Sequence, residues 1–124
     1  MLLINVWATW CGPCIVEFPE LVKINRMYHA RDFQFITISA DTASQNDKVL
    51  AFLKGKHAAN KNYLYTGDNS QQLFKAIDPK WLGTLPYTIL VEPGGKIVYA
   101  KQNLIDPFTL KKNIVDNKLI GRVY

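Results

Sequence analysis

The 124-residue chain is poor in the side chains that bind metals. It holds only two cysteines and two histidines, and the histidines, His29 and His57, lie far apart. A structural zinc site normally takes four ligands, from two cysteine pairs or from a cysteine pair and a histidine pair. The cysteine pair therefore favours redox chemistry over zinc binding. A purely structural disulfide is also disfavoured, because a bridge across two residues closes little chain entropy.

Long apolar runs and blocks of like charge are absent as well. No stretch approaches the ~20 apolar residues of a membrane span, and the short apolar start lacks the basic flank of a secretory signal. The net charge is +5, but the basic residues are scattered along the chain. This distribution indicates a solvated surface and no nucleic-acid partner. The length and the 48% hydrophobic share predict a single globular domain over residues 1–124.

The two cysteines occur in the sequence Trp10-Cys11-Gly12-Pro13-Cys14. Residues 2–7 before it are nearly all apolar and predict a buried strand, and the residues after it have helical spacing. Cys11 should therefore lie at a helix N-terminus, where unpaired N–H groups and the helix dipole favour its thiolate. Cys14, one turn further on, can attack a mixed disulfide formed by Cys11. The motif predicts dithiol–disulfide exchange.

The apolar periodicity predicts alternating strands and helices. The expected strands are 2–7, 33–39, 63–65, 87–91 and 96–100, and the expected helices are 11–30, 44–59, 70–77 and 107–117. Pro19 is expected to kink the first helix, and Ser44 is the expected N-cap of the second. This order predicts an α/β fold with a central mixed sheet and helices on both faces. A small β-α insertion, about residues 61–80, precedes the C-terminal hairpin.

The motif and its surroundings resemble the thioredoxin superfamily. The matching segments are residues 6–14, Pro19 five positions after the second cysteine, and Thr84-Leu85-Pro86 before the hairpin. Further segments are similar to the TlpA/ResA-type branch, namely Glu17-Phe18-Pro19, Pro93-Gly94-Gly95-Lys96 and the insertion. The resemblance implies a thioredoxin fold and a bacterial thiol–disulfide oxidoreductase that acts mainly as a reductant of protein disulfides.

The resemblance also implies a setting for this activity. Members of the branch are periplasmic or otherwise extracytoplasmic, usually membrane-tethered, and some serve cytochrome c maturation. The implied partners are protein thiols and disulfides and a membrane thiol reductant. No cofactor is implied beyond the redox-active disulfide of Cys11 and Cys14. The extra N-terminal strands usual in the family are missing here, so we expect the chain to be a fragment of a longer precursor that carries a membrane tether.

Three residues are the expected catalytic groups. Cys11 is the expected nucleophile because it is the more exposed cysteine at the helix start, and Cys14 is the resolving thiol. Glu17 lies three residues after Cys14 on the same helix face, where a carboxylate with a raised pKa can accept the thiol proton. The alternative for Glu17 is a solvated residue in the first helical turn.

Other residues are expected to bind substrate or to fill the core. Trp10, Gly12 and Pro13 should form an apolar rim around Cys11. The resemblance implies that Pro86 has a cis peptide bond and that the backbone of Leu85 receives an extended substrate segment. Trp7 is expected in the core. Asn5, which stands where ordinary thioredoxins carry a buried acid, is expected as a hydrogen-bonded polar group there.

The residues leave other functions open. A general cytosolic thioredoxin would share the cysteine motif, although the insertion and Glu17 are not typical of one. A copper(I)-binding module of this fold would use both thiolates without turnover, but such proteins usually have a wider cysteine spacing and a distal histidine. A peroxidase would need a Pro-x-x-x-Thr-x-x-Cys setting, whereas Thr9 lies two positions before Cys11.

Overall fold

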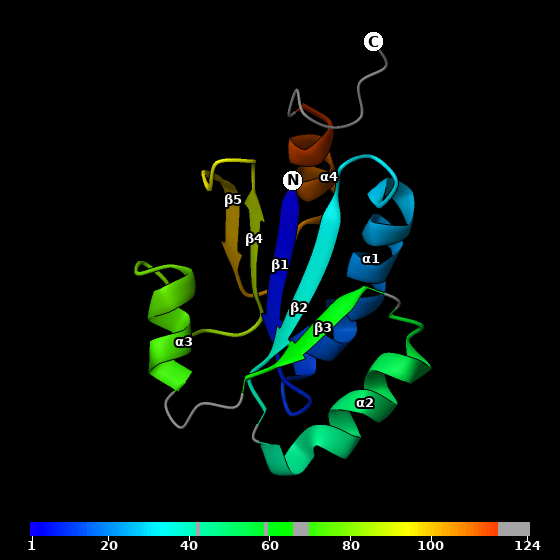
Figure 1. Cartoon of the computed structure of the whole chain (residues 1–124), viewed down its shortest axis with the longest axis vertical. Coiled ribbons are helices and arrows are strands. Elements are labelled where there is room, and N and C mark those ends of the chain that lie inside the picture. Colours follow the sequence, from blue (N-terminus) through cyan, green and yellow to red (C-terminus); the bar gives the residue numbers. More distant parts are fainter. Residues whose placement is uncertain (42, 59, 66–69, 117–124) are drawn as a thin grey trace.

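A computed structural model describes residues 1–41, 43–58, 60–65 and 70–116 (Figure 1). Five strands form one mixed sheet in the order β3-β2-β1-β4-β5. The strands are β1 (Leu2–Trp7), β2 (Gln34–Ser39), β3 (Lys61–Leu64), β4 (Tyr87–Val91) and β5 (Ile97–Gln102). The α-helices are α1 (Gly12–Tyr28), α2 (Asn46–Gly55), α3 (Ser70–Ile77) and α4 (Pro107–Asp116), and a 3-10 turn, η1 (Ala43–Gln45), precedes α2.

Strand β1 lies at the centre of the sheet, and its two neighbours run in opposite directions. It runs parallel to β2, with Val6 opposite Ile38, and antiparallel to β4, with Ile4 opposite Ile89. The unit β1-α1-β2 is therefore the predicted βαβ crossover. Strand β3, from the insertion, pairs parallel with β2 at one edge, and β5 closes the other edge as the second strand of the hairpin. The predicted mixed sheet is confirmed.

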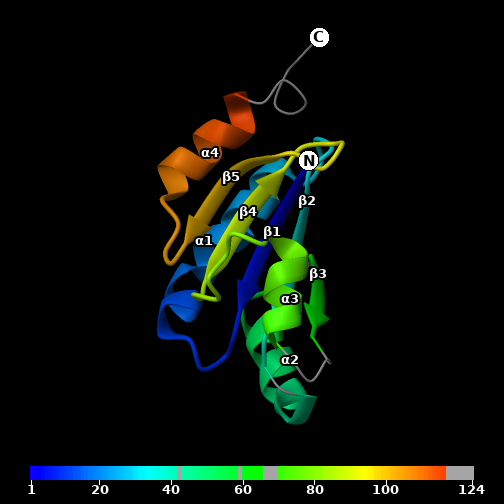
Figure 2. The same ribbon diagram turned by 90° about the vertical axis from the view of Figure 1, so that its left-hand side faces the viewer.

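The side chains of β1 point alternately to two faces, and each face packs against different helices. Leu3 faces α1 and α4, which share one apolar cluster with Phe35 and Leu90 and lie on one side of the sheet in Figure 2. Val6 faces the opposite way and packs with Phe74 of α3. Helices thus cover both faces, as predicted. No helix in the described ranges is both long and apolar enough to cross a membrane.

The second helix differs from its prediction at both ends. Residues 43–45 form a 3-10 turn, so α2 begins at Asn46. The N-cap position belongs to Gln45, which makes no side-chain capping bond. The prediction of Ser44 as the N-cap is therefore wrong, because Ser44 lies inside the 3-10 turn. The helix ends at Gly55, four residues before the predicted end at position 59, which lies outside the described residues. Glycine weakens a helix because it loses the most backbone freedom on folding.

The hairpin and the remaining helices follow the predictions closely. The turn between β4 and β5 is closed by the Gly95 N–H, which donates to the Glu92 carbonyl at 3.0 Å. Gly94 and Gly95 have φ values of +101° and +96°, a conformation that side chains other than glycine rarely adopt. Helix α1 continues through Pro19 to Tyr28. Helix α3 has its predicted bounds, and α4 is described up to Asp116, while residue 117 lies outside the described residues.

We expect Leu90→Ala to lower the free energy of unfolding by about 2–5 kcal/mol. Leu90 is fully buried in β4 in the cluster shared by α1 and α4, so truncation leaves a cavity. The matched control is Leu50→Ala on α2, where the side chain is 45% exposed and the expected change is below about 0.5 kcal/mol. Urea denaturation of both variants gives the comparison. Equal losses would contradict the placement of Leu90 in the core.

Candidate active site at the start of helix α1

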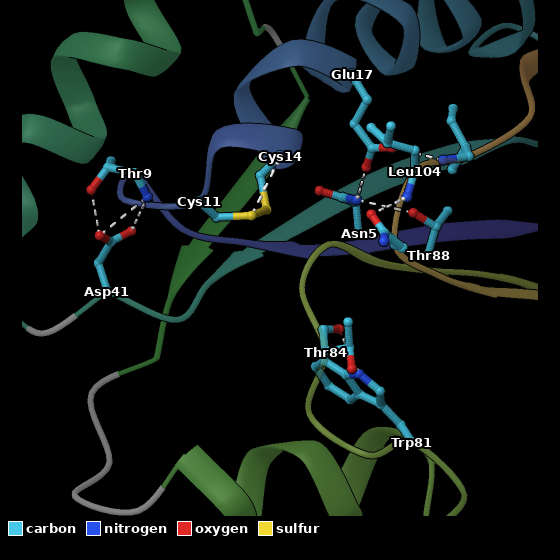
Figure 3. Close-up of a disulfide and its surroundings, with 12 residues drawn as sticks. Asn5, Thr9, Cys11, Cys14, Glu17, Asp41, Trp81, Thr84, Thr88 and Leu104 are labelled. Atoms are coloured by element: carbon cyan, nitrogen blue, oxygen red, sulfur yellow. Dashed lines mark hydrogen bonds between the residues drawn. A yellow bond between two sulfur atoms is a disulfide. The ribbon is translucent and has the colours of Figure 1, made fainter.

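The cysteine pair lies at the junction of β1 and α1 (Figure 3). After β1 ends at Trp7, the Cys11 N–H donates to the Ala8 carbonyl at 3.1 Å and turns the chain into the helix. Cys11 is the N-cap residue, with an extended backbone, and its Sγ accepts a bond from the Cys14 N–H at 3.3 Å. Cys11 and Cys14 form a disulfide, with their Cα atoms 5.3 Å apart.

The two sulfurs have different surroundings. Cys11 is 6% exposed and Cys14 is 1% exposed, so Cys11 is the more accessible sulfur, as predicted. The first turn of α1 contains no acidic residue, and Pro13 occupies it without an N–H group to leave unpaired. The N-terminal end of the helix therefore retains its partial positive charge, and the Cys14 N–H points toward the Cys11 sulfur. A thiolate at this sulfur is stabilised over one in water.

A buried aspartate holds the loop that precedes Cys11. Asp41, 2% exposed, accepts hydrogen bonds from the Thr9 N–H at 3.0 Å, from the Thr9 hydroxyl, and from the Ser39 hydroxyl at 2.6 Å. Figure 3 shows the Asp41 carboxylate directed at Thr9. These bonds fix the end of β1 to the end of β2, two residues before the cysteine. The sequence predicted only a turn at Asp41. Its place just after a strand parallel to β1 was the one signal that could have indicated the contact with Thr9.

Glu17 is buried on the same helix, one turn after Cys14. Its side chain is 4% exposed, so the interpretation of Glu17 as a solvated residue is wrong. One carboxyl oxygen accepts from the Asn5 amide at 3.2 Å, and the other accepts from the Ile105 N–H at 2.9 Å. Asn5 also donates to the Thr88 hydroxyl at 3.0 Å, so it is hydrogen-bonded as predicted. The Ile105 contact was not predicted, because a backbone group 88 residues away leaves no signal in the side-chain pattern.

The burial of Glu17 changes its protonation. Desolvation raises the pKa of the Glu17 carboxyl from 4.5 to about 7, and the bonds from Ile105 and Asn5 offset only part of that rise. Near neutral pH the carboxyl is therefore present in both protonation states. A group with such a pKa can accept and return a proton at a nearby sulfur.

The loop before β4 forms the other side of the site. The Leu85–Pro86 peptide bond is cis, as the family resemblance implied. Leu85 packs against the apolar cluster that contains Cys11 and Cys14. Trp10 is 70% exposed, and Gly12 and Pro13 are also exposed. Trp7 is fully buried, as predicted.

The histidines do not take part in the site. His29 is exposed at the end of α1, and its ring Nδ1 lies 3.1 Å from the Asn25 carbonyl oxygen. His57 is exposed after α2. Within the described ranges, no group of three or more His, Cys, Asp or Glu side chains is placed to hold a metal ion.

A mixed sheet with a cysteine pair at the start of the helix after its central strand defines the thioredoxin class of fold. The sequence profile of the Redoxin family matches residues 1–119, and the chain belongs to this family. It is 29% identical over 97 residues to the thiol–disulfide oxidoreductase ResA of Bacillus subtilis, covering 78% of this chain and 50% of ResA. The thioredoxin superfamily and its ResA-like branch, recognised from the sequence, are thereby confirmed.

Solved structures support the same fold. A thioredoxin-related protein from Neisseria meningitidis serogroup B matches with a TM-score of 0.76 and 28% identity, over 90% of this chain and 80% of that one. A protein from Chlorobium tepidum, described as a thiol:disulfide interchange protein DsbE, has a TM-score of 0.76 at 22% identity, over 92% of this chain and 77% of that one. The chain spans about half the length of the ResA relative.

We expect the stability of the oxidised protein to decrease with pH through Glu17. The pKa is about 7 in the folded chain and 4.5 as the unperturbed value, so the folded chain binds this proton more tightly. The resulting stabilisation is complete below about pH 4.5 and is lost as the pH rises through about 7. Urea denaturation between about pH 5 and about pH 8 should show that the unfolding free energy decreases more steeply with pH for wild type than for Glu17→Gln.

The comparison uses the slope of unfolding free energy against pH and not its absolute value. The glutamine amide must turn an N–H group toward one of the two donors, which changes the absolute stability. Glu20→Gln is the matched control on the same helix, since Glu20 is 39% exposed and pairs with Lys23 at 3.7 Å. Its slope should equal that of wild type. The same slope in Glu17→Gln and wild type would mean that Glu17 is not desolvated in the folded chain.

Proposed function

We propose that the chain is a thiol–disulfide oxidoreductase that reduces protein disulfides through Cys11 and Cys14. The observation that carries the proposal is the position of Cys11 at the N-cap of α1, where its Sγ accepts the Cys14 N–H at 3.3 Å. That geometry stabilises a thiolate and places a second thiol one turn away. The name of the ResA relative supports the same activity.

The exchange proceeds in two steps that transfer two electrons. In the first, the Cys11 thiolate attacks one sulfur of the substrate disulfide, a mixed disulfide forms, and the other substrate sulfur leaves as a thiolate. In the second, the Cys14 thiolate attacks Cys11 Sγ. The Cys11–Cys14 disulfide forms, and the remaining substrate sulfur leaves as a thiolate that takes up a proton. The dithiol is oxidised and the substrate disulfide is reduced.

Glu17 is proposed as the proton acceptor for Cys14. The second step requires the Cys14 thiol to lose its proton, and at 1% exposure this thiol has little contact with water. The carboxyl of Glu17, with a pKa of about 7, is buried one turn further along the same helix. It can take the proton from the protein side, while Cys11 faces the substrate.

Substrate is proposed to bind across the rim and the loop before β4. Trp10, Gly12 and Pro13 are exposed beside Cys11 and offer apolar contact. Within the part of the chain that the structure describes, the N–H and carbonyl of Leu85 make no hydrogen bond, whereas the Pro86 carbonyl accepts from Asn103. The Leu85 backbone is therefore available to pair with an extended substrate segment, as in strand addition.

The ResA-like relationship extends the proposal to the cellular setting. We place the activity outside the cytoplasm of a bacterium, with a membrane thiol reductant that regenerates the dithiol and a membrane tether in the complete protein. The Gly12-Pro13 pair between the cysteines is similar to the reducing members of the superfamily. Reduction of the haem-binding cysteines in cytochrome c maturation is one candidate role.

We expect each cysteine variant to fail at a different step. With dithiothreitol as the electron source, wild type should reduce insulin and Cys11→Ser should not, because no nucleophile remains. Cys14→Ser should form a mixed disulfide with the substrate that persists, because the resolving thiol is missing. Mass spectrometry of non-reduced samples detects this adduct. Insulin reduction by Cys11→Ser at the wild-type rate would overturn the assignment.

We expect Glu17→Gln to slow the second step by about 100-fold near neutral pH, the lower end of the usual effect of a general base. The first step should change much less, because Cys11 does not depend on this carboxyl. Stopped-flow measurement of mixed-disulfide formation and decay across pH separates the steps, and Glu20→Gln is the control. Superimposable pH profiles for Glu17→Gln and wild type would exclude Glu17 as the proton acceptor.

A further inference from the structure

Trp81 lies in the connection between α3 and β4, and its indole is buried, 4% exposed. The indole N–H donates to the Thr84 carbonyl at 2.8 Å. Figure 3 shows the ring directed at Thr84 on the loop that leads to β4. The same ring stacks on Tyr87, with the centroids 4.3 Å apart and the planes at 12°. A single side chain therefore holds the residues on both sides of Leu85–Pro86.

The support for Trp81 comes from the insertion. Phe74 of α3 also contacts the indole, with the ring centroids 4.3 Å apart and the planes at 51°. The Tyr87 hydroxyl donates to the carboxylate of Asp78, the residue directly after α3. Phe74, Trp81 and Tyr87 form one apolar cluster with Val6 and Ile89 of the sheet. The anchor of the loop is thus a packed core and not a surface contact.

The loop itself makes few other hydrogen bonds within the described part of the chain. Thr84 is exposed, and the backbone of Leu85 has no hydrogen bond within the described part of the chain. Without the indole N–H, water would satisfy the Thr84 carbonyl, and residues 83–85 could adopt several backbone directions. The hydrogen bond from Trp81 removes that freedom before a substrate arrives. A pre-ordered segment binds an extended partner at a lower entropic cost.

We propose that Trp81 is a positioning residue that fixes the Leu85 backbone for main-chain pairing with a polypeptide substrate. The proposal rests on the proposed function, since it assumes that disulfide-bearing polypeptides dock beside Cys11. The effect of Trp81 on reduction should therefore depend on the class of substrate. A polypeptide disulfide that lies along Leu85 needs the ordered loop, whereas a small aromatic disulfide needs only access to the Cys11 sulfur.

The test uses Trp81→Phe, which keeps a ring against Tyr87 and removes the N–H to Thr84. The substrates are a peptide disulfide with extended flanks on both cysteines and 5,5′-dithiobis(2-nitrobenzoate). We expect KM for the peptide to rise about 3- to 10-fold, the range for one lost hydrogen bond. Its kcat should stay within about twofold of wild type, and the rate constant for the small disulfide should not change.

Phe74→Leu is the matched control, because it loosens the same aromatic cluster and leaves the indole N–H in place. It should lower thermal stability and leave KM for the peptide unchanged. If Trp81→Phe does not fold, Trp81→Tyr keeps a larger ring in the same place, also lacks the indole N–H to Thr84, and should also raise KM for the peptide alone.

The outcomes separate the two proposals. An unchanged KM in folded Trp81→Phe, or equal losses with both substrates, would overturn the role of Trp81 and leave the proposed function intact. The absence of reduction of either substrate by wild type would overturn the proposed function and the role of Trp81 with it. A peptide-specific rise in KM that Phe74→Leu does not reproduce would support the proposal.

Discussion

The buried carboxyl group of Glu17 requires hydrogen-bond donors, because a carboxyl without them is costly to remove from water. The donors come from Asn5 in β1 and from the Ile105 N–H before α4. Asn5 in turn donates to Thr88 in β4. One side chain of α1 thus links the central strand, its antiparallel neighbour and the start of the last helix. This network places the carboxyl on the same helix as the cysteine pair and restricts where α1 can lie on the sheet.

The parallel pairing of β1 and β2 brings a second carboxylate to the site. Because both strands end at the same edge of the sheet, Thr9 after β1 lies beside Asp41 after β2. Asp41 accepts three donors and holds the loop that enters α1. Figure 3 shows Asp41 and Glu17 on opposite sides of the Cys11–Cys14 disulfide. The first carboxylate fixes the direction of the loop, and the second lies one turn after Cys14 in the same helix.

The sequence predicted features that depend on local pattern and did not predict those that depend on distant backbone. The bounds of β1, α3 and β4 are as expected, because apolar runs and turn residues mark them. The predicted start of α2 was wrong, since a 3-10 turn has no distinct side-chain signature. The motif led to Cys11 and Cys14, and the resemblance to the TlpA/ResA branch led to Glu17. The Ile105 N–H and the indole of Trp81 could not be found in this way, because their partners are backbone groups.

The two sides of the site are ordered by different means, and the difference agrees with the role proposed for each side. On the cysteine side, order comes from hydrogen bonds that also stabilise charge, at the N-cap of α1 and at Asp41. On the side proposed to bind substrate, order comes from aromatic rings packed behind the Leu85–Pro86 segment. A sulfur that becomes an anion needs dipoles near it. A backbone segment that must pair with a partner needs its own N–H and carbonyl left unbound, so it has to be held through its neighbours in the sequence.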